Sequence, residues 1–554
     1  MDRKNFVLGI FCLALAFGLM IRQDRQMRRS IPSEQTTTAS NAASPQPLPR
    51  IESAQPALPK TVIKPINERI ITLENDFVRV NFTNCGGAIR TVALKKYPAE
   101  LNRSEPYIFN QNADLPVLGL GWKVNDPLCV KDYQVSKYTE DFIQFATQLE
   151  DGTEIVRGYR LPASNADNPY LILHETLIKG SRERRQICLH LGIFPATSGD
   201  KYQEYLNFGA FDGKEAEFIK VGDFEASNGF FGLGQKAGRD FVQVYKSFNW
   251  GSIKNQFFTA ILTPQVPALG YYAAPGKILL NERLEACISG QLFFDLQEDN
   301  HPLSMKYYVG PKDFLLLNKM GNEQDQVMQF GFFGGISKLL LIAMRGIHTY
   351  VPNWGWTIIL LTFIIKLLMW PLTQAQLHSS KRMASIQQPL REIREKFKSN
   401  PQKLQAETMK LFKAHRVNPA MGCLPLLVQL PIFLGLYFML RTSSEMRFQT
   451  FLWIKDLSVP DTVAHWGVFP VNILPILMGV TMVVQMRLMP TPAMDNMQQK
   501  ILMWMPLLFL VFCYSFPAAL VLYWTIQNVF TILQQELTNR FGKAEKRTVT
   551  PLTQ

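Results

Sequence analysis

The 554-residue sequence lacks the short motifs by which common enzymes and metal sites are recognised. It has no C-x-x-C pair, and its seven cysteines are widely spaced, so neither a zinc ribbon nor a dithiol redox centre is predicted. It also has no nucleophile elbow, no phosphate-binding loop and no other spacing of metal ligands. We therefore expect no metal, no cofactor and no enzymatic reaction.

Charged residues are also scarce after Trp354, except in the loop over residues 375–420 and at the C-terminal end. Phe, Leu, Ile, Met and Trp recur there in runs of about 15 to 20 residues, the length that crosses the hydrocarbon core of a membrane. Five such runs occupy residues 355–374, 422–440, 468–486, 501–516 and 518–535. The sequence predicts a five-helix transmembrane core over residues 351–540.

A sixth apolar run, from Asn5 to Ile21, lies near the start of the sequence and is followed by arginines. No small-residue cleavage site follows it, so we predict an N-terminal transmembrane anchor over residues 1–22 rather than a cleaved signal peptide. Residues 23–67 are rich in Pro, Ser, Ala, Gln and Thr, a composition that predicts a disordered linker.

From about residue 68, apolar and polar residues alternate, as they do in Phe77–Phe82 and Ile89–Leu94. Alternation with a period of two is typical of β-strands that bury one face. Asp151-Gly152 separates two such stretches and predicts a hairpin. Residues 68–325 are therefore predicted to form an all-β domain, a sandwich.

Residues 326–350 carry apolar side chains at helical spacing between Phe332 and Ile347. The polar side chains that share the opposite face are Ser337, Lys338, Arg345 and His348. This pattern predicts an amphipathic helix that lies in the membrane interface. A helix packed against the β domain is the alternative.

The loop over residues 375–420 is strongly basic, with ten Lys and Arg against three Glu. Since positive loops remain in the cytoplasm, this loop is predicted to be cytoplasmic, and the basic tail over residues 541–554 agrees. The number of crossings then places both termini in the cytoplasm and the β domain outside it. Ala384–Phe397 and Pro401–His415 predict a basic helical hairpin that contacts either anionic lipid or the RNA of a partner.

One charge remains inside the five apolar runs, Lys366, near the middle of the first. A lone charge at mid-bilayer costs roughly 3 kcal/mol on insertion scales, and no acidic residue in these runs offsets that cost. We therefore expect water to reach Lys366, with a side chain that snorkels to the headgroups as the alternative. Thr362 lies one turn away on the same face. Polar groups on other runs are Gln429, Thr525, Gln527 and Asn528.

The motifs around these residues resemble the YidC/Oxa family of membrane-protein insertases, especially its long members from Gram-negative bacteria. The stretches that carry the resemblance are Asn353-Trp-Gly355, Thr362-Phe-Ile-Ile-Lys366, Pro371-Leu-Thr-Gln-Ala-Gln376, Val417-Asn-Pro419, Gly422-Cys-Leu-Pro-Leu426, Gln429-Leu-Pro-Ile-Phe433, Leu474-Pro-Ile-Leu-Met-Gly479, Met497-Gln-Gln-Lys500 and Leu520-Val-Leu-Tyr523. Ile70–Tyr97 and Tyr308–Lys312 are similar to the family's periplasmic domain, so the resemblance covers almost the whole chain. It implies the bacterial inner membrane as the compartment, with the β domain in the periplasm.

The resemblance also implies a substrate groove, open to the cytoplasm and to lipid, with a positive residue at its centre. That residue is usually arginine, and Lys366 stands in its place. The groove residues predicted in this way are Lys366, Thr362, Gln429, Tyr523 and Trp524, where Trp524 occupies a position that is usually tyrosine. The implied hydrophobic slide, along which the substrate helix leaves, consists of Leu430, Pro431, Phe433, Leu507, Leu508 and Phe512.

The implied function is that of an insertase and chaperone that integrates, folds and helps assemble inner-membrane proteins, alone or with the Sec translocon. The implied partners are nascent membrane proteins, the Sec translocon, the lipid bilayer and, through the basic hairpin and tail, the ribosome and the signal recognition particle. A solute transporter with a periplasmic sensory domain is the alternative, but it predicts inverted repeats that the sequence does not show. An enzyme acting on lipid needs convergent acids, bases or a metal, which one lysine does not supply. A structural scaffold for the Sec translocon needs no charge in a groove.

Overall fold

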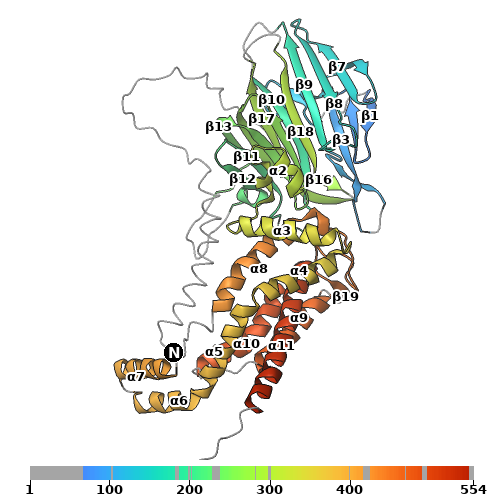
Figure 1. Cartoon of the computed structure of the whole chain (residues 1–554). Coiled ribbons are helices and arrows are strands. Elements are labelled where there is room, and N and C mark those ends of the chain that lie inside the picture. The colour runs from blue at the N-terminus through green and yellow to red at the C-terminus, as the bar shows by residue number, and fades with distance from the viewer. Residues whose placement is uncertain are drawn as a thin grey trace, which may run out of the picture. The chain divides into compact units, whose positions relative to one another are not determined.

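The computed structural model describes most of the chain between residues 67 and 547 (Figure 1). The described ranges are 67–101, 104–180, 186–197, 200, 203–226, 237–280, 282–296, 301–398, 400–415, 424–467, 469–488 and 496–547. The anchor predicted over residues 1–22 lies outside them, as does nearly all of the predicted linker. The chain divides into two compact units, which we call the β unit (Asp24–Met328) and the helical unit (Gln329–Gln554 with Met1–Gln23).

The β unit is built from antiparallel strands. They are β1 (Ile70–Glu74), β2 (Val78–Thr83), β3 (Ala88–Pro98), β4 (Pro106–Phe109), β5 (Leu120–Gly121), β6 (Gln134–Tyr138), β7 (Phe142–Gln148), β8 (Glu154–Arg160), β9 (Leu171–Lys179), β10 (Gln186–Pro195), β11 (Asn207–Phe211), β12 (Ala216–Lys220), β13 (Val242–Phe248), β14 (Trp250–Lys254), β15 (Phe258–Pro264), β16 (Ala268–Leu280), β17 (Arg283–Asp295) and β18 (Leu303–Pro311). Short helical turns are η1 (Pro127–Val130), η2 (Val221–Asp223), α2 (Phe314–Lys319) and η3 (Gln324–Met328).

These strands form three sheets within the described part of the β unit. Four strands run in the order β1-β2-β3-β4, five in the order β13-β16-β17-β10-β5, and nine in the order β12-β11-β14-β15-β18-β9-β8-β7-β6. The alternating stretches Phe77–Phe82 and Ile89–Leu94 fall in β2 and β3, as predicted. The predicted hairpin at Asp151-Gly152 is confirmed, since Gly152 adopts φ +84° between β7 and β8.

The five-stranded and nine-stranded sheets pack face to face. Phe208 of β11 and Tyr271 of β16 bring their ring centres to 4.7 Å from each other across the two layers. The Tyr307 hydroxyl of β18 donates a hydrogen bond of 2.5 Å to the carbonyl of Leu191 in β10. Both contacts bury large side chains between antiparallel sheets. The structure is therefore the layered β domain that the alternation predicted.

Arg157 of β8 joins all three sheets of the β unit. Its side chain is fully buried and donates to the carbonyls of Gly86, next to β3, and Leu118, next to β5. A third contact, 3.2 Å long, joins it to Nε2 of His174. Because a guanidinium is always a donor, Nε2 accepts, and Nδ1 of His174 donates to the carbonyl of Gly158. The imidazole is thus held neutral, and burial together with the Arg157 charge keeps the pKa of His174 well below its usual range.

Two further cations lie inside the β unit, Lys254 and Lys312, each with 1% of its surface exposed. The Lys254 ammonium donates to the carbonyl of Val327 and lies 4.3 Å from the centre of the Phe218 ring. Lys312 follows β18 directly. Burial lowers the pKa of Lys312 to about 7, although the nearby Asp200 carboxylate opposes part of the shift. Buried ammonium groups of this kind are penalised in the folded state.

Replacing Lys312 with Met is therefore expected to stabilise the β unit near neutral pH. An unfolded lysine has a pKa of about 10.4, so between pH of about 7 and 10.4 the unfolded chain binds more protons than the folded chain. The free energy of unfolding of the natural protein should therefore rise with pH through this window. Below pH 7, the folded state carries the whole cost of burying the Lys312 ammonium. Scanning calorimetry of the full-length protein in detergent at pH 7 and pH 9.5 measures the effect.

Lys312→Met should raise the melting temperature of the β unit at pH 7 and reduce its dependence on pH. The matched control is Lys306→Met, because Lys306 is an exposed lysine on the same strand, β18. An equal response of the two variants would show that burial of Lys312 carries no such penalty.

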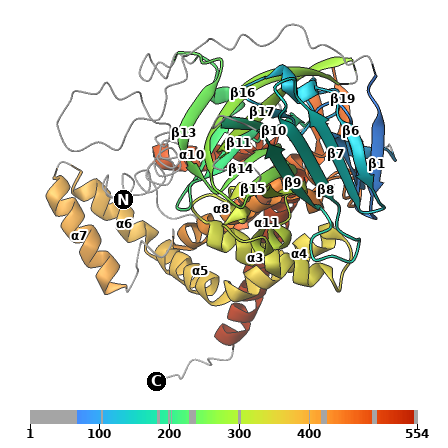
Figure 2. The same cartoon turned by 90° about the horizontal axis from the view of Figure 1, so that it is seen from above.

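The helical unit contains helices and one small hairpin. They are α3 (Gly334–His348), α4 (Trp354–Leu368), α5 (Trp370–Ser385), α6 (Gln387–Lys396), α7 (Pro401–Ala414), α8 (Leu424–Thr442), η5 (Ser444–Met446), β19 (Thr462–Trp466), β20 (Phe469–Asn472), α9 (Ile473–Leu488), α10 (Asn496–Cys513) and α11 (Ala518–Arg547). Helices α6 and α7 occupy the predicted basic hairpin and lie side by side (Figure 2).

Among the described residues, no helix by itself has both the length and the apolar composition that a bilayer crossing requires. Helices α4 and α5 meet that requirement only as a pair, bent by 59°. Pro371 stands at the start of α5, where its ring removes the hydrogen bond that would continue α4. The first predicted run, residues 355–374, is therefore not one straight helix.

Two other predicted runs differ from the helices of the structure in where they begin. The third, residues 468–486, was predicted to be helical throughout, but Phe469–Asn472 forms β20 and pairs with β19, so helix α9 begins only at Ile473. The fourth, residues 501–516, corresponds to α10, which begins at Asn496 and ends at Cys513. Hydropathy locates apolar side chains, whereas backbone hydrogen bonding decides where a helix begins and ends.

The predicted faces of α3 were wrong in part. Ser337 was assigned to the polar face, but its side chain is buried and donates a hydrogen bond of 3.0 Å to the carbonyl of Gly435 in α8. Arg345, from the same face, pairs with Glu445 after α8. Leu339, on the predicted apolar face, is 66% exposed, as a side chain that contacts lipid would be. The buried face of α3 thus contains Ser337 beside the apolar Leu340, Leu341 and Met344, because the Ser337 hydroxyl has an acceptor on α8.

Candidate functional site

Lys366 lies on the face of α4 that packs against α11. The Asn353 side chain caps the start of α4 by accepting a hydrogen bond of 3.2 Å from the amide of Trp356. Lys366 is 3% exposed, and its ammonium donates a hydrogen bond of 2.9 Å to the Thr531 hydroxyl of α11. Its side chain is therefore turned toward the neighbouring helix. Lys366 was predicted near the middle of its apolar run, but it lies in the last turn of α4, which ends at Leu368.

Lys366 has no carboxylate partner among the residues that the structure describes. A threonine hydroxyl satisfies one of its three donors and supplies no negative charge. Burial of a cation under these conditions costs several kcal/mol, so the site holds positive charge that the surrounding protein does not neutralise. The expected contact with water stays a prediction.

A row of polar side chains continues from this contact along α11. Its members are Gln527, Thr531, Gln534 and Thr538, at intervals of four, three and four residues. Each of the last three bonds a residue of α4 or α5: Thr531 accepts from Lys366, Gln534 donates to Thr373 at 2.8 Å, and Thr538 accepts from Gln374 at 2.9 Å.

The sequence interpretation missed this row beyond Gln527. Helical spacing of polar residues within an otherwise apolar helix was the signal that would have found it, because residues three and four apart share a face. The row holds α4 and α5 against α11 by side-chain hydrogen bonds.

The same row extends to α8 through Gln429. The Gln429 amide donates to the Tyr523 hydroxyl, and Gln527 donates to Gln429 Oε1 at 3.5 Å. Gln527 Oε1 and both side-chain heteroatoms of Gln535 are buried and have no hydrogen-bond partner among the described residues. Buried amides of this kind call for water or a polar ligand. The structure thus brings Lys366, Gln429 and Tyr523, three of the predicted groove residues, into one polar network.

The other two predicted groove residues lie differently. The Thr362 hydroxyl is buried on the same face of α4 as Lys366 and donates 2.6 Å to the carbonyl of Ile358 in its own helix. Trp524 does not belong to the polar network through any described hydrogen bond. Its ring instead meets Phe433 edge-to-face at 4.6 Å and lies 5.1 Å from Phe509.

Trp524 therefore connects the two halves of the predicted slide. Leu430, Pro431 and Phe433 of α8 are half-buried, while Leu507, Leu508 and Phe512 of α10 are 48%, 64% and 64% exposed. Phe433, Trp524, Phe509 and Phe512 form a continuous row of ring contacts across α8, α11 and α10. An apolar surface of this kind favours contact with lipid or with an apolar helix.

No group of three or more His, Cys, Asp or Glu side chains that would suit a metal ion occurs within the described ranges. The cysteines that the structure describes, Cys85, Cys129, Cys188, Cys287 and Cys513, are buried and unpaired. The chemistry of the site is therefore that of one buried cation, a set of amides and hydroxyls, and an adjoining apolar surface.

Residues 346–546 match the model of a family described as "60Kd inner membrane protein". A relative from Lawsonia intracellularis, named membrane protein insertase YidC, is 29% identical over 491 residues, which are 86% of this chain and 88% of that protein. A relative of the same name from Wolinella succinogenes is 41% identical over 246 residues, 44% of each chain. A solved structure of an active YidC insertase is 19% identical, with a TM-score of 0.35, and the match covers 85% of this chain and 92% of that one.

Proposed function

Because this chain belongs to the YidC/Oxa family of membrane protein insertases, we propose that it receives the polar segment of its substrate at Lys366. The chain is an inner-membrane protein, and its substrates are nascent membrane proteins. The observation that supports the role of Lys366 is its burial in the helical unit, where no carboxylate of the described residues pairs with it. A positive site of this kind attracts the acidic groups of a segment that must cross the membrane.

In this proposal the polar network on α11 forms the wall of a hydrophilic groove. The unpartnered amide atoms of Gln527 and Gln535 would bind water or the backbone of the incoming segment. Each hydrogen bond made there replaces one that the segment loses on leaving water, so the barrier to half-crossing the bilayer falls. The groove needs no bound nucleotide, because transfer of apolar side chains into lipid and the membrane potential on moving charges supply the driving force.

The apolar part of the substrate follows a different route in the proposal. The row from Phe433 through Trp524 and Phe509 to Phe512 borders the exposed Leu507 and Leu508 of α10. A substrate helix that packs along this slide passes from the polar network to lipid without exposing its apolar face to water. Trp524 would therefore act at the slide rather than inside the groove.

We also propose the orientation. Helices α4 with α5, α8, α9, α10 and α11 would cross the membrane, with both termini and the basic helices α6 and α7 in the cytoplasm. The β unit would then lie in the periplasm. Basic residues on α6, α7 and the end of α11 suit contacts with anionic lipid or with the RNA of a ribosome or signal recognition particle, and the Sec translocon is a further proposed partner.

Reconstitution tests this function. The full-length protein in liposomes is expected to insert a small Sec-independent membrane protein whose translocated segment is acidic, and protease protection measures the inserted fraction. Empty liposomes are the control for spontaneous insertion. A folded protein that inserts no more substrate than empty liposomes would contradict the proposal.

A further inference from the structure

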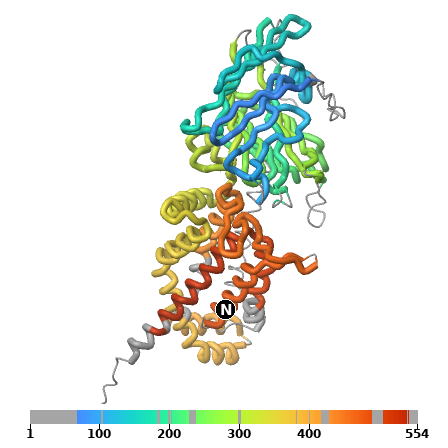
Figure 3. The backbone as a smooth tube through the Cα atoms, turned by 90° about the vertical axis from the view of Figure 1, so that its right-hand side faces the viewer, coloured from blue at the N-terminus to red at the C-terminus, as the bar shows by residue number. Residues whose placement is uncertain are grey.

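The β19–β20 hairpin projects from the helical unit on a rigid base (Figure 3). Thr462 and Asn472 join the two strands at the base by a side-chain hydrogen bond of 2.7 Å. The Asn472 amide donates 2.6 Å to the carbonyl of Tyr514, and the Tyr514 hydroxyl donates 2.6 Å to the carbonyl of Pro470. The segment between α10 and α11 therefore holds the hairpin in a fixed direction.

The tip of the hairpin is apolar and has no packing partner among the described residues. Trp466 and Phe469 face each other across the two strands and are 85% and 74% exposed. Val463 adds a third apolar side chain, 46% exposed. Thr462–Asn472 contains no Lys, Arg, Asp or Glu. An exposed β-ribbon in water normally carries charge that prevents association, and this one carries none.

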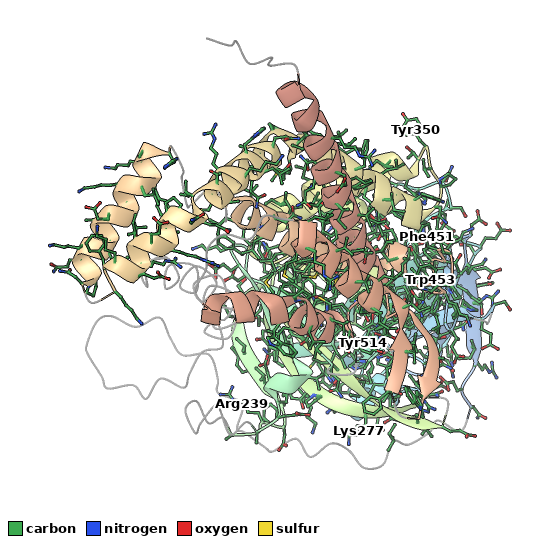
Figure 4. All side chains as sticks on the ribbon, turned by 90° about the horizontal axis from the view of Figure 1, so that it is seen from below. Arg239, Lys277, Tyr350, Phe451, Trp453 and Tyr514 are labelled. Carbon is green, nitrogen blue, oxygen red and sulfur yellow. The ribbon has the colours of Figure 1, made fainter. Side chains whose placement is uncertain are left out.

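A second apolar projection lies beside the hairpin. A turn closed by Phe451 and Ile454 presents Leu452, which is 73% exposed, and Trp453. The indole nitrogen of Trp453 donates 3.1 Å to Asp461, whose carboxylate also accepts 2.7 Å from the amide of Leu474 at the start of α9. Leu452 adopts φ +52°, a backbone conformation that is strained for leucine, and its side chain is nevertheless exposed. Figure 4 labels Phe451, Trp453 and Tyr514, which lie on the same side of the helical unit as the hairpin strands.

Lipid is the occupant that these surfaces favour. Helix α9 follows β20 directly and carries an exposed apolar stripe of Ile476, Val480 and Val484, at intervals of four residues. The tip of the hairpin is thus continuous in the chain with a surface that faces lipid if α9 crosses the membrane. Trp and Phe next to such a helix are typical of the headgroup boundary. An aromatic ring there contacts apolar acyl chains on one side and polar headgroups on the other.

We propose that Trp466, Phe469, Leu452 and Trp453 insert into the headgroup boundary of the outer leaflet and fix the depth of α9 in the membrane. This proposal rests on the membrane placement of α9 but not on the substrate groove. The expected depth of an interfacial segment is about 5–10 Å into the boundary between headgroups and acyl chains.

The test is fluorescence quenching of the full-length protein in liposomes. The emission of Trp466 is obtained as the difference between the natural protein and Trp466→Phe, a substitution that keeps an apolar ring at the tip. We expect lipids brominated near the glycerol backbone to quench this emission more strongly than lipids brominated near the chain end, and iodide in the water to quench it weakly.

Three results would overturn the proposal. Strong quenching by iodide with none by brominated lipid would show that the tip faces water and is free to bind another protein. Quenching by neither agent would show that the protein itself covers the tip. An emission that changes with the ratio of protein to lipid would show that a second copy of the chain covers it. None of these fluorescence measurements depends on insertase activity. A failure of the groove proposal would therefore appear only in the insertion experiment and would be distinguished from a failure of this proposal.

Discussion

Replacing Lys366 with Glu is expected to reduce the insertion rate of a substrate with an acidic translocated segment at least about tenfold. The substitution replaces attraction of the acidic segment by repulsion at a buried position. Charges a few ångströms apart at such a position interact by more than about 1.4 kcal/mol, the energy that corresponds to a tenfold change in rate. Lys366→Arg keeps the charge and should stay close to the natural rate. Insertion into liposomes, measured by protease protection, reports both.

The charge of Lys366 and its packing can be separated. Lys366→Met keeps an unbranched side chain and removes the cost of burying the charge, so it should preserve or raise the melting temperature while slowing insertion. The control variant Thr531→Val removes the hydrogen-bond acceptor and keeps the charge. The charge hypothesis predicts that Thr531→Val slows insertion much less than Lys366→Met does. It also predicts that a substrate whose acidic residues are replaced by amides responds little to Lys366→Met. Equal losses with acidic and neutral substrates would identify Lys366 as a packing residue only.

Replacing Gly355 with Val is expected to lower the stability of the helical unit by about 3 kcal/mol or more, at the upper end of overpacking costs. A Cβ atom at Gly355 would lie 2.1 Å from Cγ of Phe451, a distance that side chains do not reach without a shift of one helix or loop. Phe451 is 5% exposed and also contacts Trp356 edge-to-face at 5.5 Å, so its ring has little freedom to move. Thermal unfolding in detergent measures the loss.

Two variants make this result specific. Phe451→Ala in the Gly355→Val background should restore part of the stability, because the space of the removed ring accepts the added methyl groups. Gly346→Ala in α3 is the matched control, since no atom lies within 4 Å of a Cβ placed there, and it should be neutral or stabilising. Strictly additive losses in the double variant would contradict the steric explanation.

The strands of the β unit were predictable where a local pattern decided them. In β2 and β3 the period of two follows from one buried face, and Asp151-Gly152 supplied the backbone freedom for a turn. Arg157 shows the limit of this reasoning. Nothing in its strand indicates that it bonds Gly86 and Leu118, because those carbonyls come from segments distant in the sequence that only the folded sheets bring together.

The helical unit shows the same division. Apolar runs located its helices, but the bounds of α9 and α10 depended on a hairpin and on backbone hydrogen bonds that hydropathy does not report. Trp524 was grouped with Lys366 because the family resemblance implied that its position, which is usually tyrosine, lines the groove. The side chains of neighbouring residues in a helix point about 100° apart. Tyr523 therefore contacts Gln429, whereas Trp524 contacts Phe433.

The sequence by itself determined that a lone cation lies in an apolar segment, that a basic loop follows it, and that alternating strands precede it, because each is a property of neighbouring residues. Tertiary structure decided that Thr531 accepts from Lys366, that a polar row on α11 links α4, α5 and α8, and that Trp466 is exposed on a rigid hairpin. The partners in these contacts lie far apart in the chain. Packing of helix on helix selects them, since side-chain periodicity fixes a face but not what covers it.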